Sequence, residues 1–472
     1  MAPSTVTSPR GEGLALWQKL ASASLLAAYF LWFAWDGLHA RWASDDMMNI
    51  YLPWKPGPWH LLYSQFALWH GEYRPMGGAF YVPMFHFFGF NPLPYRIAIL
   101  LLLGLNVWVA YRFARALGCG ELAATLAAAV VAYHGGLGSL HYNTDTIYDI
   151  LCFTFYFGAF LYYAGIRSRG RLPGAGQTAV FLALFVCALN SKEMAVTLPV
   201  ALLAYEMFFH LPDGWKPSAL RAWVLGPGRT ALWAGAVTLL SLYGKKYGPN
   251  GLLHSPNYQP VFTLERIVNF QRMWIRELFF WNDIGVIGMV AFWAAVTALA
   301  WALRRPALRF CWVFVVVAPL PIEFLEGRDQ ACLYIPLAAW AVFAAIIVSE
   351  EAARLSRNRA LMAAFLAVPL LFWVRENRYL QKTYVHKAMV QQGLLTQEVI
   401  RQFDALQPRV PPHSEVVFLS DPFDGYDMEF IANLWLRDRT TNVHLQRIQR
   451  LPESEVAKMI RFTWENGKLV KL

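Results

Sequence analysis

The chain has few charged residues and few cysteines, and each shortage narrows the class of protein. Only 15% of the 472 residues are charged, whereas a soluble protein averages about 25%. The five cysteines stand in or beside apolar segments without CxxC spacing, which indicates buried apolar side chains rather than a disulfide framework or a metal site. We also find no internal repeat. These shortages argue against a soluble enzyme and against a scaffold built from repeats.

Apolar and aromatic residues are abundant and gather in long segments. A helix needs about 20 predominantly apolar residues to cross a bilayer. By that measure the sequence predicts an α-helical polytopic membrane protein with about eleven transmembrane helices. The fifth and sixth segments are separated only by residues 190–193, and Pro199 together with their combined length favours two re-entering helices. The predicted spans are 17–38, 93–115, 120–136, 147–166, 177–191, 194–211, 230–246, 284–303, 310–323, 331–349 and 360–375.

Positive charges predict the orientation of these helices. Lys and Arg recur in alternate connecting segments, whereas the connection at 137–146 has neither. By the positive-inside rule the N-terminus is cytoplasmic, and an odd number of spans places the C-terminus outside. The net charge of +10 therefore reflects topology and contact with anionic headgroups, and no nucleic-acid partner is expected. The basic residues in question are Arg112, Arg115, Arg167, Arg169, Arg171, Lys216, Arg221, Arg229, Arg304, Arg305, Arg309, Arg354, Arg357 and Arg359.

Three larger pieces are predicted to lie outside the membrane. Long loops at 39–92 and 247–283 belong to a membrane domain at 1–375, and residues 376–472 form a small soluble domain. Within the second loop, residues 262–281 mix Arg and aromatic side chains at helical spacing, which is typical of a helix lying at the membrane surface. Glu415–Ser420 and Val443–Leu445 have the pattern of strands, which predicts an α/β fold for the C-terminal domain.

An acidic pair follows the first predicted span. Asp45 and Asp46 are adjacent, after Ser44, and two neighbouring carboxylates near a membrane imply that a cation, a metal ion or a proton is handled there. The alternatives are a solvated pair in a loop and a cap for the helix that follows. The pair alone does not decide between these interpretations.

Four further polar clusters lie in the outward connections. Each one could be an ion pair at a helix end, but four on one face of the membrane suggest a shared cavity. The clusters are His70–Pro75 with His70, Glu72 and Arg74; His141–Asp149 with Asp145; Asn190–Glu193 with Lys192 and Glu193; and Glu323–Asp329 with Arg328.

The order of these motifs resembles that of GT-C-type membrane glycosyltransferases, the class that includes protein O-mannosyltransferases and uses polyprenyl-phosphate sugars. The resemblance covers most of residues 30–340 and does not include the tail. It rests on Asp45-Asp46 after the first span, Tyr73-Arg74-Pro75 leading to Gly89-Phe-Asn-Pro92, Ser191-Lys192-Glu193 followed by Leu198-Pro199, and Gly327-Arg328 followed by Tyr334-Ile-Pro336.

The resemblance implies an inverting transfer of a hexose or pentose from a polyprenyl-phosphate donor to an acceptor hydroxyl. Asp45 would be the general base, with Asp46 next in line. Fixed cations would receive the phosphate: Arg74, Lys192 and Arg328, with Arg272 and Arg276 in reserve. Asp145 and Glu193 would orient a sugar hydroxyl or the cations, with His70 and Glu72 supporting them. The implied partners are the lipid-linked donor, membrane lipid, and a glycan, protein or lipid acceptor.

The implied location is a bacterial inner membrane with the site on the periplasmic face, or the endoplasmic reticulum membrane of a eukaryote. Mg²⁺ or Mn²⁺ would suit the oxygen ligands, but no His/Asp spacing requires a metal ion. A transporter or flippase of a lipid-linked or anionic substrate is the main alternative. It would place charges near the midplane in repeated halves. An acyl or phosphoryl transferase would need a nucleophile or a His–Asp pair, and no HxxxxD-like spacing stands out in an outward loop.

Overall fold

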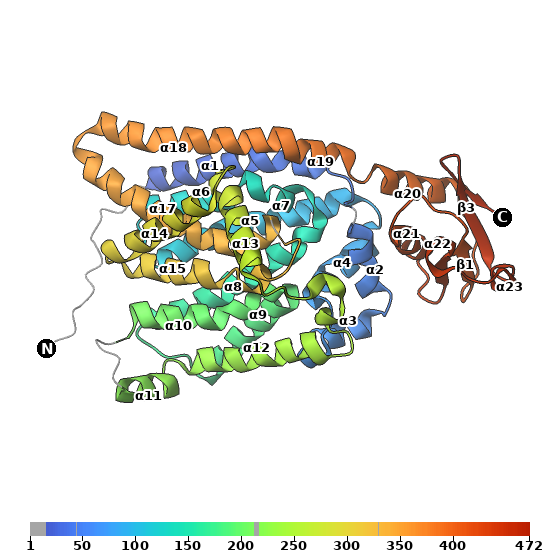
Figure 1. The fold of residues 1–472 in the computed structure, drawn as a ribbon, viewed down its shortest axis with the longest axis horizontal. Coiled ribbons are helices and arrows are strands. Elements are labelled where there is room, and N and C mark those ends of the chain that lie inside the picture. The colour runs from blue at the N-terminus through green and yellow to red at the C-terminus, as the bar shows by residue number, and fades with distance from the viewer. Residues whose placement is uncertain (1–15, 44, 212–216, 329) are drawn as a thin grey trace.

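A bundle of long helices forms most of the molecule, and a small sheet stands at one of its ends (Figure 1). The computed structural model describes residues 16–43, 45–211, 217–328 and 330–472. Each of the eleven segments predicted to span the membrane falls largely within a helix. These helices are α1 (Leu16–Ala34), α5 (Pro92–Ala116), α6 (Glu121–Ala132), α8 (Ile147–Arg167), α9 (Ala175–Ser191), α10 (Leu198–Phe209), α12 (Arg229–Tyr247), α14 (Val286–Ala302), α15 (Pro306–Val317), α17 (Tyr334–Arg354) and α18 (Arg359–Leu380).

Length and apolar composition mark a subset of these helices as able to cross a membrane. Five continuous helical segments qualify, and the shorter helices α6, α9 and α14 are also apolar. These helices indicate an integral membrane protein, while the number of spans and their orientation stay predictions. The five segments are Pro92–Ala116, Thr144–Arg167, Pro306–Glu323, Gln330–Arg357 and Arg359–Leu406.

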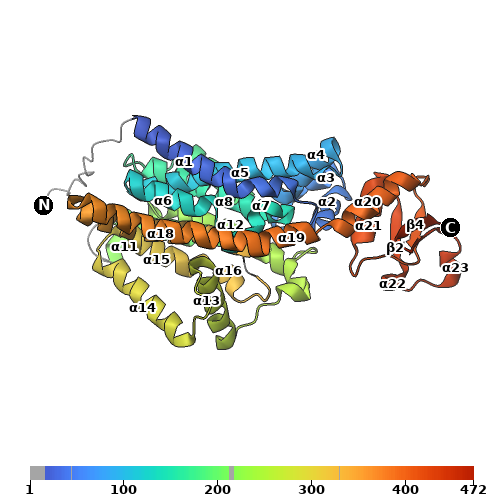
Figure 2. The same cartoon turned by 90° about the horizontal axis from the view of Figure 1, so that it is seen from above.

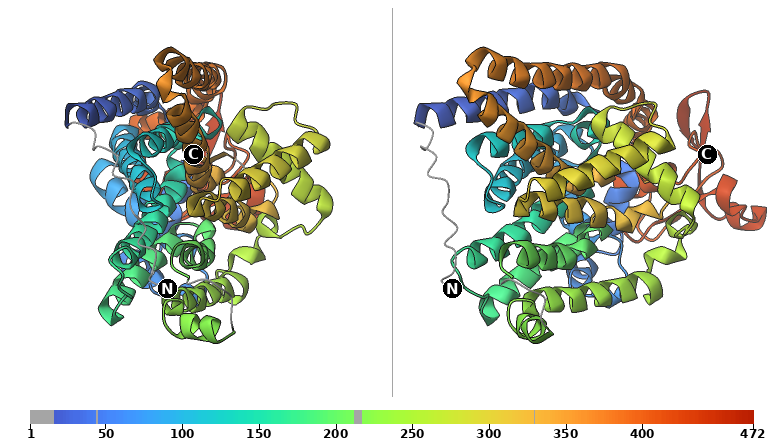
Figure 3. Two further views of the ribbon diagram at one scale, coloured as in Figure 1. Left: turned by 90° about the vertical axis from the view of Figure 1, so that its left-hand side faces the viewer. Right: turned by 60° about the vertical axis from the view of Figure 1, so that its left-hand side comes forward.

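The two ends of the bundle differ in the connections that they carry. The α10–α12 region, which includes α11 (Pro217–Leu225), and the α14–α15 and α17–α18 connections lie at the end marked by the N-terminus (Figures 1 and 2). The sheet and the helices of residues 46–88 lie at the opposite end, which Figure 3 shows from two further directions. These three arginine-rich connections are thus separated from the pieces predicted to face outward. Lys216, in the first of them, lies outside the described residues.

Residues 39–92, predicted as a loop, are largely helical. They form α2 (Asp46–Trp54), α3 (Pro58–Ser64) and α4 (Pro75–Phe88). Pro58 and Pro75 stand in the first turns of α3 and α4, where the missing N–H costs nothing and the fixed φ favours a helix. The proline content that suggests a loop therefore starts two of these helices. Together they build a layer over one end of the bundle.

The chain breaks between α9 and α10, which confirms two helices rather than one. α9 ends at Ser191, and Lys192 has an extended backbone with φ −159° and ψ 151°. A short 3-10 turn, Glu193–Thr197, then leads into α10, which has Pro199 in its first turn. The break carries Lys192 and Glu193 into the interior of the protein.

The amphipathic segment 262–281 forms a helix, α13 (Leu264–Phe279), as its spacing predicts. The side-chain oxygen of Thr263 accepts a hydrogen bond from the Arg266 N–H and caps the first turn. The buried residues Phe270, Trp274, Ile275 and Leu278 lie on one face, and the Trp274 ring is 5.3 Å from that of Trp340 in α17. α13 therefore packs on the bundle through its apolar face, while its place at a membrane surface stays a prediction.

The C-terminal residues form a four-stranded sheet in the order β2-β1-β3-β4. β1 is parallel to β2 and β3, and β3 is antiparallel to β4, which agrees with the predicted α/β fold. The β3–β4 hairpin was not predicted, although Asn466 and Gly467, both with positive φ, are a typical hairpin turn. The strands are β1 (Glu415–Phe418), β2 (Asn442–Leu445), β3 (Ile460–Glu465) and β4 (Lys468–Lys471), with α20 (Leu394–Leu406), α21 (Asp427–Leu436), α22 (Gln446–Gln449) and α23 (Glu453–Val456).

The sheet domain is docked on α2. Lys55 Nζ donates to Asn433 Oδ1 (3.0 Å) and to the Thr441 carbonyl (2.7 Å), and Tyr51 Oη donates to Glu429 (3.5 Å). α21 therefore lies along the helix that begins at Asp46. On the other side, α18 continues into a π turn and α19 (His386–Gln391) toward the domain. The boundary predicted at residue 375 falls within α18, and the division into two domains stays a prediction.

Candidate functional site

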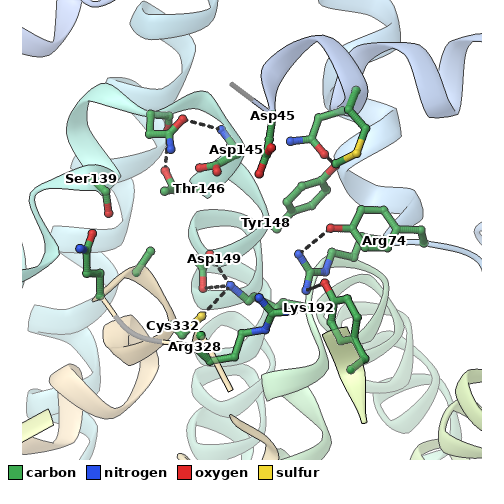
Figure 4. A pocket seen from close by; sticks show the side chains of 18 residues that line it. Asp45, Arg74, Ser139, Asp145, Thr146, Tyr148, Asp149, Lys192, Arg328 and Cys332 are labelled. Carbon is green, nitrogen blue, oxygen red and sulfur yellow. Dashed lines mark hydrogen bonds and ion pairs between the residues drawn. The ribbon is translucent and has the colours of Figure 1, made fainter. Parts of the chain in front are cut away.

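A cavity of about 260 Å³ opens where the layer of α2 and α4 meets the bundle. Five of the side chains predicted from the sequence line it together: Asp45, Arg74, Asp145, Lys192 and Arg328 (Figure 4). They come from α2, the start of α4, the turn before α8, the α9–α10 break and the segment before α17. Two members of the predicted clusters, Ser44 and Asp329, lie outside the described residues.

The basic side chains of the cavity are held by carboxylates and tyrosines. Arg74 Nη2 donates to Glu193 Oε2 (2.8 Å), and Arg74 Nη1 donates to the Tyr73 hydroxyl (3.1 Å). Lys192 Nζ donates to both oxygens of Asp149, each at 2.6 Å. The Arg328 guanidinium lies 4.4 Å from the centre of the Tyr258 ring. Three cations are thus fixed on one side of a single cavity.

The buried charges of this region stabilise one another. Burial raises the pKa of Glu193, but the positive charges of Arg74 and Lys245 outweigh it and hold that pKa at about 2. Burial lowers the pKa of Lys192, but the carboxylate of Asp149 outweighs it and raises the pKa above the ordinary lysine value. Glu193 and Lys192 therefore stay charged at neutral pH.

The acidic side of the cavity has two carboxylates of a different kind. Asp45 and Asp145 have no hydrogen-bond or ion-pair partner for their carboxylates among the described residues, and Figure 4 shows the two side chains near each other. Asp45 stands at the N-cap position of α2 without a side-chain cap bond. Asp45 therefore occupies the cap position, but its carboxylate does not cap the helix. A carboxylate without a partner is available to accept a proton or a hydrogen bond.

Asp46, predicted next to Asp45 as a catalytic candidate, does not line the cavity. Its side chain is fully buried, and Oδ2 accepts from the Ala43 N–H (2.6 Å) and lies 3.7 Å from Arg96 Nη2. Arg96 Nη2 in turn donates to the Arg41 carbonyl (2.5 Å). Asp46 and Arg96 thus hold the segment from which Asp45 enters the cavity.

The other predicted residues lie around the cavity and not in it. Glu193 forms an ion pair with Arg74 but is not itself a lining residue. The side chains of Glu72 and His70 form a hydrogen bond, with Glu72 Oε1 2.9 Å from His70 Nδ1. Lys245 Nζ donates to the Glu72 carbonyl (2.7 Å). These contacts brace the turn that leads to Arg74. The reserve cations Arg272 and Arg276 are on α13 and are not among the lining residues.

Several lining residues were not given a role from the sequence, although Tyr148 and Asp149 lie within the predicted cluster His141–Asp149. Asp149 pairs with Lys192, and Tyr148 donates its hydroxyl to Asn49 Oδ1 (2.9 Å). A signal for Asp149 was present, because it follows Asp145 by four residues and one helical turn places both on the same face. Gly77 lets Tyr148 approach, since a Cβ there would be 1.9 Å from the Tyr148 ring. Nothing in the sequence marks Tyr258, which lies in the second outward segment, 66 residues after the preceding lining residue, Lys192.

Donor groups for a metal ion are few in the described part of the chain. Within the described ranges, no group of three His, Cys, Asp or Glu side chains could hold a metal ion. The cavity itself offers the carboxylates of Asp45 and Asp145. A divalent cation stays a prediction from the sequence, and we assign no step to a metal ion.

The buried carboxyl of Asp46 should make the stability of the folded protein depend on pH. Burial raises the pKa of Asp46 from 3.8 to about 6, against the lowering effects of Arg96 and the Ala43 N–H. Between these values the folded protein takes up a proton that the unfolded chain does not. The Asp46 carboxyl therefore contributes most to the free energy of unfolding below about pH 4. As the pH rises through 6, the free energy of unfolding falls by about 3 kcal/mol.

We expect Asp46→Asn to remove this dependence. The variant leaves Arg96 without its partner at every pH, so the comparison between two pH values is the informative quantity. The melting temperature of the variant minus that of the wild type should increase between pH 4 and pH 7, as measured by thermal unfolding in detergent. Asp424→Asn, at an exposed position of the tail, is the control. A difference that does not change with pH would contradict the expectation.

Comparison with known proteins finds likeness among solved structures. No protein-family model and no curated protein matches the chain. Among solved structures, the crystal structure of ArnT from Cupriavidus metallidurans bound to undecaprenyl phosphate is similar, with a TM-score of 0.48 and 15% sequence identity. The match covers 95% of this chain and 92% of that one. Likeness at this level leaves the function to be inferred from the cavity itself.

Proposed function

We propose that the chain is a membrane glycosyltransferase that moves a sugar from a polyprenyl-phosphate donor to the hydroxyl of an acceptor. The observation that supports this most is the division of one cavity into two sides. Asp45, a carboxylate without a partner among the described residues, lines the cavity together with Arg74, Lys192 and Arg328. Such a site can take a proton at one point and receive an anion at another.

The reaction follows from those two sides. The Asp45 carboxylate takes the proton of the acceptor hydroxyl while its oxygen attacks the anomeric carbon from the face opposite the phosphate. The bond between that carbon and the phosphate oxygen breaks, and the electron pair leaves with the phosphate. A phosphate needs no strong acid to depart, so one carboxylate suffices where inverting glycosidases use two. The arginine side chains match the geometry of phosphate oxygens.

An apolar groove beside the cavity supports a lipid-linked donor. It has a volume of about 430 Å³ and lies among α10, α12 and α15, with Val200, Leu242 and Val317 in its walls. Tyr258 lines both the groove and the cavity. We assign the groove to the first isoprene units of the donor, whose phosphate would then reach Arg74 and Arg328.

The proposed reaction takes place on the non-cytoplasmic face, which is the periplasmic face if the membrane is a bacterial inner membrane. The cavity is lined by residues at the starts of α2 and α4, and these helices lie at the end of the bundle that carries the sheet, away from the α10–α12, α14–α15 and α17–α18 connections (Figure 1). Positive side chains mark the cytoplasmic side of a membrane protein, which supports this assignment.

The test uses the full-length protein in lipid nanodiscs with polyprenyl phosphate carrying a radiolabelled sugar. We expect the label to pass to a hydroxylated acceptor with inversion at the anomeric carbon, read by NMR of the product. Arg328→Ala should raise the KM for the donor. Movement of an intact lipid-linked substrate across a vesicle membrane, with no cleavage of the sugar–phosphate bond, would contradict the proposal and favour the transporter alternative.

A further inference from the structure

One wall of the cavity is polar but carries no charge. Ser139, Asn143 and Gln330 line it, and Figure 4 shows Ser139 across the cavity from Arg74. These residues come from α7 (Ser139–Tyr142), the turn that follows it, and the segment before α17. The proposed proton transfer and phosphate binding use none of them. This wall is called the neutral wall below.

Ser139 is the residue of the neutral wall that most clearly points to a ligand. Its side chain is only 8% exposed, and its hydroxyl oxygen has no hydrogen-bond partner within the described part of the chain. Proteins leave few buried hydroxyls unpaired, because such a group has lost its water without replacement. A buried hydroxyl at the surface of a cavity is explained if a ligand there completes its hydrogen bonds.

Asn143 and Gln330 add hydrogen-bonding groups of both kinds. The Asn143 side-chain oxygen accepts from the Asp145 N–H (3.5 Å), which leaves its amide N–H groups for the cavity. The side-chain amide of Gln330 has no partner among the residues that the structure describes. Gln330 also has a φ of 44°, a left-handed conformation that a residue with a side chain rarely adopts and that gathers at functional sites.

The neutral wall matches sugar hydroxyls better than a sugar carboxylate. A hydroxyl both donates and accepts, as do Ser139 and the amide of Gln330. A sugar carboxylate would meet the carboxylates of Asp45 and Asp145, which line the same cavity, and like charges at close range repel one another.

We propose that Ser139, Asn143 and Gln330 form the subsite for the donor sugar, bind its hydroxyls and select a sugar that carries no carboxylate. The proposal rests on the proposed function and extends it to the class of the donor. Thr146 has a supporting place, because its hydroxyl donates to the Asn143 carbonyl (2.7 Å). In this arrangement the ring lies between the neutral wall and the cations that hold the phosphate.

The first experiment compares donors. Polyprenyl phosphates carrying a neutral hexose and the matching hexuronic acid are given to the full-length protein in nanodiscs, and kcat/KM is measured for each. We expect the neutral hexose to exceed the hexuronic acid by at least about tenfold. A hexuronic acid donor that is used equally well or better would overturn the proposal.

The second experiment asks whether Ser139 binds one particular hydroxyl. We expect Ser139→Ala to lower kcat/KM about tenfold for the neutral donor and to have no effect on the matching deoxy donor that lacks that hydroxyl. Because the Ser139 hydroxyl has no partner within the described ranges, the variant should melt no lower than the wild type without donor. An equal loss for every deoxy donor, or no loss for any donor, would overturn the assignment of Ser139.

Two further variants complete the design. Ser414→Ala is the matched control, since its hydroxyl donates only to the nearby Pro411 carbonyl (2.7 Å) in the tail, and it should leave kcat/KM unchanged. Gln330→Ala tests the wall independently and should narrow the preference for the neutral donor. If the wild type cleaves no polyprenyl-phosphate sugar, the proposed function fails together with the subsite. If it cleaves donors without preference, the subsite alone fails.

Discussion

Replacing Asp45 with asparagine is expected to lower the rate of sugar transfer by about a thousandfold. Asparagine keeps the shape of the side chain but cannot take the proton of the acceptor hydroxyl. The cations Arg74, Lys192 and Arg328 are unchanged in this variant, so the donor should still bind. Single-turnover transfer from a radiolabelled donor measures the first effect, and equilibrium binding of the same donor measures the second.

The Asp145→Asn variant is the comparison that shows whether Asp45 in particular is the base. Its carboxylate lines the same cavity and also has no partner in the described part of the chain. We expect Asp145→Asn to reduce transfer less than Asp45→Asn does, because Asp145 is predicted to orient a sugar hydroxyl or the cations and not to take the proton. Full activity of Asp45→Asn together with inactivity of Asp145→Asn would show that the base is Asp145, and the mechanism would have to be rebuilt around it.

Replacing Lys192 with methionine is expected to have two separate effects. The variant leaves Asp149, which is 6% exposed, without its cation, and breaking a buried ion pair in this way costs about 3–5 kcal/mol of stability. It also removes a fixed charge from the departing phosphate, which should lower kcat by about a hundredfold to a thousandfold. Thermal unfolding measures the first effect and steady-state transfer the second.

A double variant separates the two effects. In Lys192→Met/Asp149→Asn the buried carboxylate is neutral, so most of the lost stability should return. Activity should not return, because the phosphate still lacks its cation. Recovery of activity together with stability would show that Lys192 is only a structural partner of Asp149 and would remove it from the donor site.

The helices could be predicted from the sequence because their signal is local. A run of apolar residues long enough for a membrane span is also a good helix. The break at residues 190–193 was predicted correctly because polar residues interrupt such a run and Pro199 follows them. The hairpin of β3 and β4 was missed although Asn466 and Gly467 mark it. The helices within 39–92 were not predicted, because the segment was interpreted only as a long outward loop, whereas Pro58 and Pro75 begin helices there.

Several residues of the site could be predicted from the sequence, but the directions in which their side chains point could not. Asp45 and Asp46 are adjacent, and successive side chains on a helix diverge by about 100°, so only one of the pair faces the cavity. Which one does so depends on Arg96, whose partner is set by packing and not by spacing. Similarly, Tyr258 joins the cavity only because the second outward segment folds back over it. Such long-range contacts leave no local pattern in a sequence.

The docking of the tail on α2 has a consequence for the biosynthesis of the protein. Lys55 and its partner Asn433 are 378 residues apart, and a ribosome adds about 5–20 residues per second. The helix that begins beside Asp45 is therefore made about 20 to 80 s before the helix that covers it. During that interval the ammonium group of Lys55 lacks its partners, and the cavity lacks one of its braces. A nascent chain thus gains this support for α2 only after α21 has been synthesised, although every residue that lines the cavity has been made by then.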